Sequence, residues 1–262
     1  MGGAGDYDYE RGGDGYARAR RTDPRIAALV HGALGTARSV VNVGAGAGSY
    51  EPTDRAVVAL EPSAAMRRQR PPGAAPVLDG VAEHLPFPDD ALDAAMAMVT
   101  VHQWRDAAAG IRELRRVARD TVVILTFDGD ALHRFWLADY APELIEAERR
   151  RYPAPGAIAA LLGPGASVTT VPVARDCVDG FTEAYYARPE AFLVEANRRA
   201  QSAWRFVDRD VEDAFVERLG SDLESGAWDA AHGPLRRQEY FEGSLRLVVH
   251  RPAAASWFDV SA

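Results

Sequence analysis

Short apolar runs alternate with helical patterns along the first half of the chain. Five runs are apolar or rich in β-branched residues and predict buried strands: 40–43, 56–60, 77–78, 92–99 and 121–127. Three segments carry helix signals. The first begins at Asp23-Pro24 and has Ile26, Leu29 and Val30 on one face. The second runs from Ser63 to Arg70, where Pro71-Pro72-Gly73 stops it, and the third covers 106–118. Strands that alternate with helices predict a mostly parallel sheet with helices on both faces.

The pattern changes after residue 128. Helices are expected over three further segments: 132–152, with a break at Pro142, 157–162 and 188–226. Two more strands are expected, at 168–173 and at 245–250, and the second closes the sheet. We therefore expect an α/β fold with a helical cap inserted in the C-terminal half.

Composition narrows the class of protein. The chain has 262 residues, 47% of them hydrophobic, so it can bury one large core, and it has no apolar run of about eighteen residues that would span a membrane. The net charge of −8 argues against binding to nucleic acid. Cys177 is the only cysteine and the six histidines lack metal-ligand spacing, so we expect no metal. The glycine-rich N-terminus lacks the order of a secretory signal, and we expect a soluble, cytoplasmic protein.

The strongest chemical signal is the sequence VVNVGAGAGSYEP at 40–52. A strand that runs into glycines brings its backbone close to whatever lies beyond its carboxyl end, where open α/β sheets bind ligands. Only eight residues, 49–56, lead from the last of these glycines to the second strand, and Pro52 interrupts them. We therefore expect the first crossover helix to be vestigial. This disfavours a dinucleotide enzyme, because such enzymes bind the pyrophosphate at the N-terminus of that helix.

An acidic residue follows the second strand, in the sequence VVALEPSAAM at 57–66. Glu61 stands where nucleotide-binding folds place a carboxylate that accepts hydrogen bonds from ribose hydroxyls. The alternative role for Glu61 is a carboxylate at a helix start, favoured by the helix dipole. Met66, one helical turn after Ser63, could cover an adenine face or belong to the core.

A third segment, GVAEHLPFPDDALDAAMAMVTVHQW at 80–104, completes an ordered set of motifs. The glycine loop, the EPSAAM sequence, the AE-x-LPFPDD-x-LD sequence and the HQW after the fourth strand together resemble the class I S-adenosylmethionine-dependent methyltransferases. The resemblance is to the UbiE/type-11-like group and the relatives of trans-aconitate methyltransferase, and it covers about residues 16–128. It implies the Rossmann-like class I methyltransferase fold, with S-adenosylmethionine as the cofactor.

The resemblance also implies a cofactor site. It places Gly44, Ala45 and Gly46 beneath the methionine moiety, Glu61 at the ribose with Pro62, Ser63 and Met66 after it, Val81, Ala82 and Glu83 around the adenine, Thr100 beside the sulfonium, and Tyr16 with Arg20 over the cofactor as a lid. An arginine in the lid would pair with the methionine carboxylate. The alternative for Arg20 is a solvated helix face, because it belongs to a local run of arginines.

Two positions depart from the family pattern. Asn42 stands where the family often has an acid in the first strand, and Val81 stands where an acid often meets the adenine amino group. Both differences remove negative charge from the expected cofactor site. We therefore expect either a modest cofactor affinity or a compensating interaction elsewhere.

Methyl transfer from a sulfonium requires alignment of the nucleophile, exclusion of water and, for some acceptors, removal of a proton. His102 follows the fourth strand at the active edge and is the best-placed general base in the sequence. Its alternative role is a hydrogen bond to the backbone, since many methyltransferases need no base.

The acceptor pocket is expected near the same edge. Gln103 and Trp104 are candidates to shape it, although a tryptophan such as Trp104 is more often a packing residue. The cap contributes the aromatic candidates Trp136, Tyr185 and Tyr186, which would suit an apolar or planar acceptor. The segment 176–193, which holds both tyrosines, also resembles the substrate-side insertion of related methyltransferases.

We therefore expect one methyltransferase domain over 1–262, in four parts: an N-terminal lid segment at 1–38, a cofactor-binding core at 39–128, a mixed helical cap and substrate-side insertion at 129–244, and a final strand and tail at 245–262. The expected reaction is methyl transfer to a small-molecule acceptor, a specialised metabolite. The alternative is a cofactor-binding protein or a cyclase on the same fold that transfers no methyl group.

Overall fold

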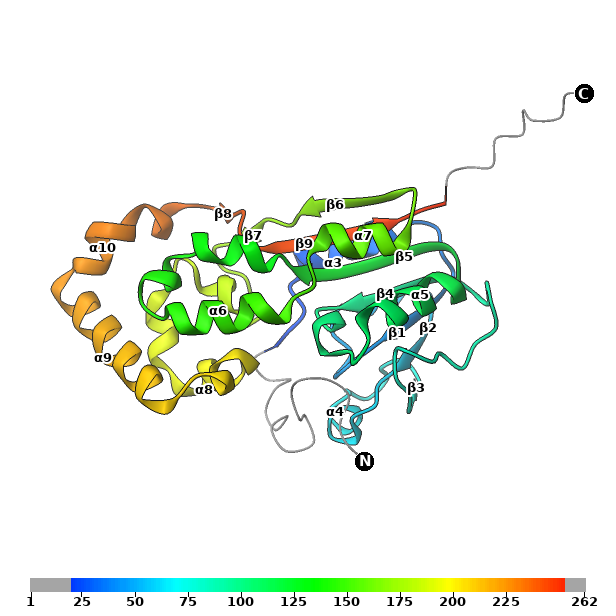
Figure 1. Ribbon diagram of the computed structural model, residues 1–262, viewed down its shortest axis with the longest axis horizontal. Coiled ribbons are helices and arrows are strands. Elements are labelled where there is room, and N and C mark those ends of the chain that lie inside the picture. Colours follow the sequence, from blue (N-terminus) through cyan, green and yellow to red (C-terminus); the bar gives the residue numbers. More distant parts are fainter. Residues whose placement is uncertain (1–19, 253–262) are drawn as a thin grey trace, which may run out of the picture.

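The computed structural model describes residues 20–252 (Figure 1). Its main sheet has seven strands in the order β3-β2-β1-β4-β5-β9-β6. The strands are β1 (Ser39–Val43), β2 (Ala56–Leu60), β3 (Val77–Leu78), β4 (Leu92–Met98), β5 (Ala118–Phe127), β6 (Ala166–Thr170) and β9 (Leu245–His250). The first five run parallel, whereas β9 lies between β5 and β6 and runs antiparallel to both. The expected α/β fold with a mostly parallel central sheet is confirmed.

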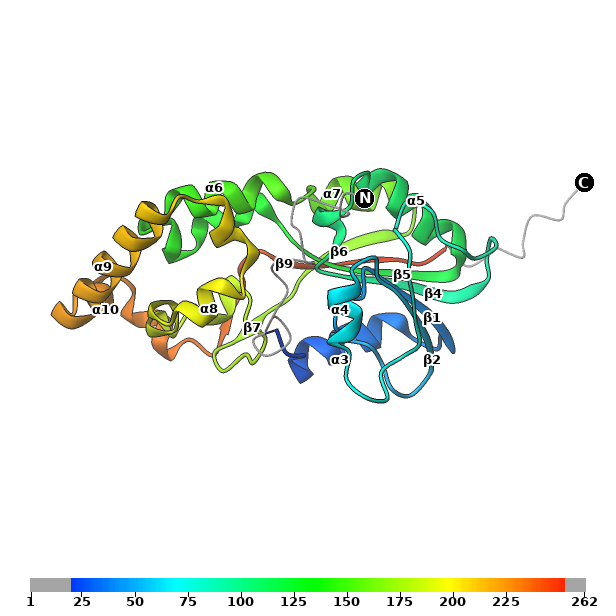
Figure 2. The same ribbon diagram turned by 90° about the horizontal axis from the view of Figure 1, so that it is seen from below.

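Helices cover both faces of this sheet (Figure 2). Helix α3 (Pro24–Leu34) lies on one face, and α5 (Ala107–Val117) and α7 (Pro155–Leu162) lie on the other. Alternate residues of a strand point to opposite faces. Val40 accordingly packs in the core beneath α3, whereas Val41 packs in the core beneath α5 and α7. The sheet is therefore buried on both sides, as its continuous apolar strands predicted.

The local start signals act as expected in two helices. The Asp23 side chain accepts a hydrogen bond from the Arg25 N–H and caps α3. Ile26 and Val30 are buried, but Leu29 is 43% exposed, so the prediction that Leu29 shares their face is wrong. Ser63 caps α4 (Ala64–Arg68), which ends two residues before the expected Arg70.

The first crossover has no helix, as expected. Residues 44–55 form turns between β1 and β2. The strand predicted at 168–173 is split, because Pro172 lacks the N–H that a continuing strand would donate. β6 therefore ends at Thr170, and a separate short strand, β7 (Val173–Ala174), pairs antiparallel with β8 (Tyr240–Phe241).

The cap lies beside one end of the sheet (Figure 1). Its α-helices are α6 (Pro142–Arg151), α8 (Glu195–Arg199), α9 (Arg209–Ser225) and α10 (Ala227–His232). The 3-10 helices are η1 (Val101–Gln103) after β4 and, in the cap, η2 (Gly129–Arg134), η3 (Trp136–Asp139), η4 (Thr182–Tyr185), η5 (Pro189–Leu193), η6 (Ser202–Phe206) and η7 (Gly233–Arg237). Helix α6 begins at Pro142, where the sequence predicted a break.

A third apolar core, rich in tryptophan and phenylalanine, lies inside the cap. The stretch expected as cap, 129–244, also supplies β6 and α7 to the main sheet layer, so the cap is not one continuous insertion. Within residues 20–252, no helix is long and apolar enough to cross a membrane.

Candidate functional site

A cavity lies at the carboxyl ends of β1, β2 and β4. It encloses about 530 Å³, part of which is open to solvent. Eight of the residues expected at the site line it: Arg20, Gly44, Ala45, Gly46, Glu61, Met66, Thr100 and Gln103. These residues come from four separate stretches of sequence, and the parallel strand ends bring them together. We call this space the first cavity.

The glycines of the loop keep the first cavity clear. Gly44 and Gly46 have φ values of 66° and 53°, in the left-handed region that favours glycine. A Cβ at Gly44 would collide with the side chain of Thr100, and a Cβ at Gly46 would lie 3.4 Å from the Met66 methyl group. The loop therefore forms a backbone-lined cradle that side chains would fill, which fits the close approach expected of a nucleoside cofactor.

Glu61 has the helix-start role that its position in the sequence suggested, and its ribose role stays a prediction. Its carboxylate is 7% exposed and accepts hydrogen bonds of 2.8 Å from the N–H groups of Gly46 and Ser63. Burial raises the pKa of Glu61, and the two backbone hydrogen bonds oppose that shift. These bonds use two of the roughly four lone pairs of the carboxylate. Glu61 therefore anchors the glycine loop to the start of α4 while it faces the first cavity, where it retains capacity to accept from ribose hydroxyls.

Asn42 belongs to a buried network that the sequence did not predict. Its Nδ2 donates to Glu51 Oε1 at 2.9 Å, and Glu51 forms an ion pair of 2.7 Å with Arg70. Both charged side chains are less than a tenth exposed. Arg70 also donates to the carbonyl oxygens of Gly46 and Ala75. A buried carboxylate therefore stands beside Asn42, and its ion pair ties the glycine loop to the segment that follows α4.

A second cavity, of about 370 Å³, adjoins the first. Arg20, Val99 and Gln103 line both. The remaining lining residues come from the sheet edge and the cap: His102, Phe127, Glu148, Tyr152, Phe181, Thr182, Gln201 and Ser202. The second cavity is therefore enclosed by the strand ends on one side and the cap on the other.

His102 lines the second cavity as expected. Its ring centroid lies 4.5 Å from that of Tyr152, and its Nε2 lies 3.3 Å from the side-chain nitrogen of Gln103. Burial, with the positive charges of Arg151 and Arg20, lowers the pKa of His102 well below its usual range. Its Nδ1 is buried and has no hydrogen-bond partner within residues 20–252. His102 is therefore a neutral imidazole at pH 7 with one ring nitrogen that no described group engages.

Two non-glycine residues at the site have left-handed backbones. Val99, between the two cavities, has φ 52°, which is rare for a β-branched residue and costs roughly 1–3 kcal/mol. Tyr50, with φ 64°, lines the first cavity. Its N–H donates to Thr22 Oγ1 and its carbonyl oxygen accepts from His31. No sequence signal indicated either conformation.

Several expected cofactor residues do not line the first cavity. Tyr16 lies outside the described residues. Pro62 and Ser63 stand at the start of α4, where Ser63 acts as the cap. Val81 is 39% exposed, Ala82 is buried against α5, and Glu83 accepts from the Asp106 N–H. The adenine contacts implied for these last three residues stay a prediction.

Most of the expected acceptor residues outside the second cavity have packing roles. The Trp104 ring lies against Gly110 of α5, where a Cβ would collide with it. Trp136 donates to the carbonyl oxygen of Tyr186 inside the cap core. Tyr186 is fully buried and stacks on Phe241. Tyr185 packs edge-on against a neighbouring phenylalanine of the cap. The role of Trp104 therefore matches the packing alternative. Tyr185 and Tyr186 pack inside the cap, and their contact with an acceptor stays a prediction.

Comparisons with known proteins agree with this geometry. A family model described as a methyltransferase domain matches residues 41–126. The chain is similar to a crystal structure from Anabaena variabilis, described as that of a methyltransferase from an antibiotic biosynthesis pathway, with 27% identity and a TM-score of 0.83. That match covers 89% of this chain and 99% of the other.

A second crystal structure, of a SAM-dependent methyltransferase from Thermotoga maritima, has the same fold. It shares 15% identity with a TM-score of 0.56, and the match covers 94% of this chain and 98% of that one. A search of curated proteins found no match. The matched segment 41–126 contains the glycine loop, Glu61 and the strand end at Thr100, which are the parts that form the first cavity.

Proposed function

The chain belongs to the class I S-adenosylmethionine-dependent methyltransferases, and from that premise we propose that it methylates a small molecule, a specialised metabolite, bound in the second cavity. The observation that carries the proposal is the shared wall of the two cavities. Arg20, Val99 and Gln103 line both, so a ligand in the second cavity would meet a cofactor in the first.

The residues of the first cavity fit the cofactor that this family uses. Glu61 would accept from the ribose hydroxyls, and the loop backbone at Gly44 and Gly46 would pass beneath the methionine moiety. Arg20 would pair with the methionine carboxylate through charge-assisted hydrogen bonds. When bound, S-adenosylmethionine supplies a methyl group that its sulfonium has already activated for displacement. The protein then has to align the acceptor, exclude water and remove a proton where the acceptor carries one.

The second cavity supports a small acceptor with both apolar and polar groups. Phe127, Tyr152 and Phe181 offer aromatic surface, and Thr182 donates to Gln201 in the same wall. The cavity encloses about 370 Å³, part of which is open to solvent, so an acceptor could enter it from outside. The net charge of −8 disfavours a nucleic-acid acceptor. The similar Anabaena variabilis protein is described as part of an antibiotic biosynthesis pathway, which supports a specialised metabolite here.

His102 is the proposed general base. It stands beside the shared wall and is neutral at pH 7, so a lone pair is open to a proton, although the burial and positive charges that lower its pKa also make it a weaker base. An oxygen or nitrogen nucleophile that loses a proton on methylation would use it.

The test is transfer of a labelled methyl group. The protein would be incubated with methyl-labelled S-adenosylmethionine and cell extract separated into small-molecule, protein and nucleic-acid fractions. After removal of unreacted S-adenosylmethionine, we expect a labelled small-molecule product that forms only when both the protein and the extract are present. Label in the protein or nucleic-acid fraction would contradict the proposed acceptor class, and no label in any fraction would contradict methyl transfer.

A further inference from the structure

Asp179 is a buried carboxylate between the cap and the first cavity. It lies in the cap segment that follows β7 and is 2% exposed. The Tyr50 hydroxyl donates to its Oδ2 at 2.7 Å, and Arg20 Nε donates to its Oδ1 at 2.6 Å. A second Arg20 nitrogen lies 3.4 Å from Oδ2. Three segments that are far apart in sequence therefore meet at one carboxylate.

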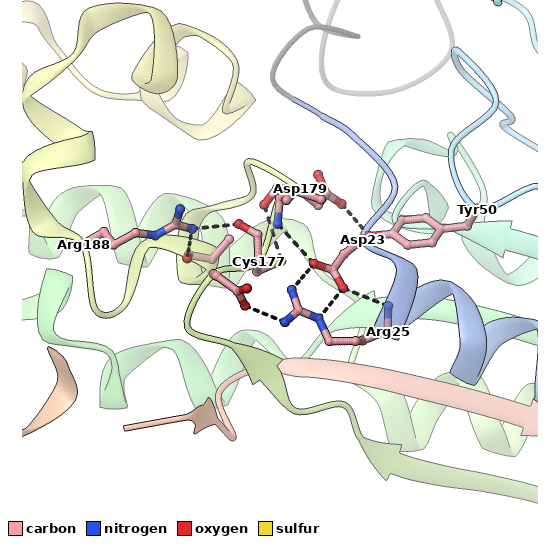
Figure 3. Close-up of polar contacts among 9 residues, drawn as sticks. Asp23, Arg25, Tyr50, Cys177, Asp179 and Arg188 are labelled. Carbon is pink, nitrogen blue, oxygen red and sulfur yellow. Dashed lines mark hydrogen bonds and ion pairs between the residues drawn. The ribbon is translucent and has the colours of Figure 1, made fainter. Parts of the chain in front are cut away.

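The same cap segment has a second attachment to the N-terminal part of the chain. Asp23 accepts from the Val178 N–H at 3.1 Å, and Arg25 forms an ion pair with Asp176. Figure 3 shows Tyr50 reaching toward Asp179, with Asp23 and Arg25 just below this contact. Asp176 is largely exposed, and neither cavity has Asp23, Arg25 or Asp176 among its lining residues. The segment is therefore attached at two places, and of these two only the attachment at Asp179 involves residues that line the cavities.

The partners of Asp179 differ in that they line the cavities. Tyr50 lines the first cavity, and Arg20 lines both. A buried carboxylate is costly unless it is paired and hydrogen-bonded, and such bonds to a guanidinium fix its position and orientation. We propose that Asp179 is a positioning residue that, together with Tyr50, holds the Arg20 guanidinium at the shared wall of the two cavities, where it binds the carboxylate of the cofactor. This inference rests on the proposed function, and it makes cofactor affinity depend on a residue of the cap.

The experiment compares two probes by calorimetry. S-adenosylhomocysteine carries the carboxylate, and S-adenosyl-thiopropylamine is the same molecule without it. Asp179→Asn is expected to weaken S-adenosylhomocysteine binding by about tenfold or more, and Tyr50→Phe by about fivefold, as for lost hydrogen bonds to charged groups. Neither substitution is expected to change the affinity for S-adenosyl-thiopropylamine by more than about twofold, because that probe offers Arg20 no carboxylate.

Asp176→Asn is the matched control, since it removes the exposed ion pair on the same segment. It is expected to leave both affinities unchanged. If Asp179→Asn and Tyr50→Phe weaken both probes equally, these residues serve the packing of the cap and the positioning role is wrong. If S-adenosylhomocysteine binding is unchanged in both variants, the inference also fails while the proposed function stands. If the unsubstituted protein binds neither probe, the proposed function itself fails.

Discussion

Single residues at the strand ends determine the shape of the first cavity. Gly44 lies against Thr100, Val99 has a left-handed backbone between the two cavities, and Glu61 accepts hydrogen bonds from the loop. The features at Gly44 and Glu61 are contacts between the glycine loop after β1 and the end of another strand. Substitutions at these positions are therefore expected to affect cofactor binding more than they affect overall stability.

Gly44→Ala tests the cradle. The new Cβ would collide with Thr100 and would also require φ 66° of an alanine. We expect loss of S-adenosylhomocysteine binding by at least about a hundredfold, because the collision displaces the loop into the cavity. Gly73→Ala is the control, since Gly73 also has a positive φ, of 83°, but has open space around it. It should lower stability by about 1 kcal/mol and leave binding intact. Equal effects of the two substitutions on binding would contradict the account.

Asn42→Asp tests the buried network at the first strand. This substitution restores the acid that the family often has, yet it would place a second carboxylate against Glu51. We expect a lower Tm and weaker S-adenosylhomocysteine binding, because two adjacent buried carboxylates repel each other. Asn42→Asp combined with Glu51→Gln should recover most of both losses. A double variant no better than Asn42→Asp alone would mean that repulsion from the Glu51 carboxylate does not cause the losses.

His102→Gln tests the general base. Removal of a base is expected to lower kcat by about a hundredfold or more for an acceptor that loses a proton. Since the pKa of His102 lies well below 6.5, the unsubstituted enzyme should show a flat rate between pH 6.5 and 8 and a fall only at lower pH. His133→Gln, at an exposed histidine, is the control. Unchanged turnover in His102→Gln would mean that His102 lines the second cavity and does not act as a base.

At the scale of elements, a buried carboxyl group joins the cap to the sheet. Glu183, in η4, accepts from the N–H and the hydroxyl of Ser244, which immediately precedes β9. Burial raises the pKa of Glu183 to about 7, although the hydrogen bonds from Ser244 oppose the shift. The folded protein therefore binds this proton more tightly than the unfolded chain does.

This raised pKa predicts how stability depends on pH. The contribution of Glu183 is fully present below its usual pKa of about 4.5 and is lost as pH rises through 7, by on the order of 3 kcal/mol. In Glu183→Gln, whose amide oxygen can still accept from Ser244, this loss should disappear. The measurement is Tm between pH 5 and pH 8 for both proteins. Parallel curves would show that Glu183 does not titrate in this range.

At the scale of the whole molecule, the parallel sheet collects loops at one edge and the cap closes over them. The sequence predicted the elements well, because strand runs, Ser63, Pro142 and the missing crossover helix are local signals. The glycine loop, Glu61 and Thr100 were also predictable, since parallel strands bring their carboxyl ends to a common edge. Leu29 was misplaced because a helix face is set by what packs against it.

The remaining features depend on tertiary contacts that no local pattern encodes. Arg20 and Asp179 are 159 positions apart, and only the folded chain brings them together. Glu51 and Arg70 likewise form a pair, although β2 and α4 separate them along the chain. The packing of the aromatic residues of the cap also depends on tertiary contacts that the sequence pattern does not show. Composition suggested a ligand-binding role for Trp136 and Tyr186, and the structure gives both to the cap core.

Mass spectrometry of the purified protein under native conditions, with and without added S-adenosylmethionine, tests the central claim most directly. The account predicts that each chain carries one S-adenosylmethionine or S-adenosylhomocysteine, released on denaturation, and that Gly44→Ala abolishes this binding. A protein that carries neither molecule, and whose Tm does not change when they are added, would contradict the assignment of the first cavity as a cofactor site.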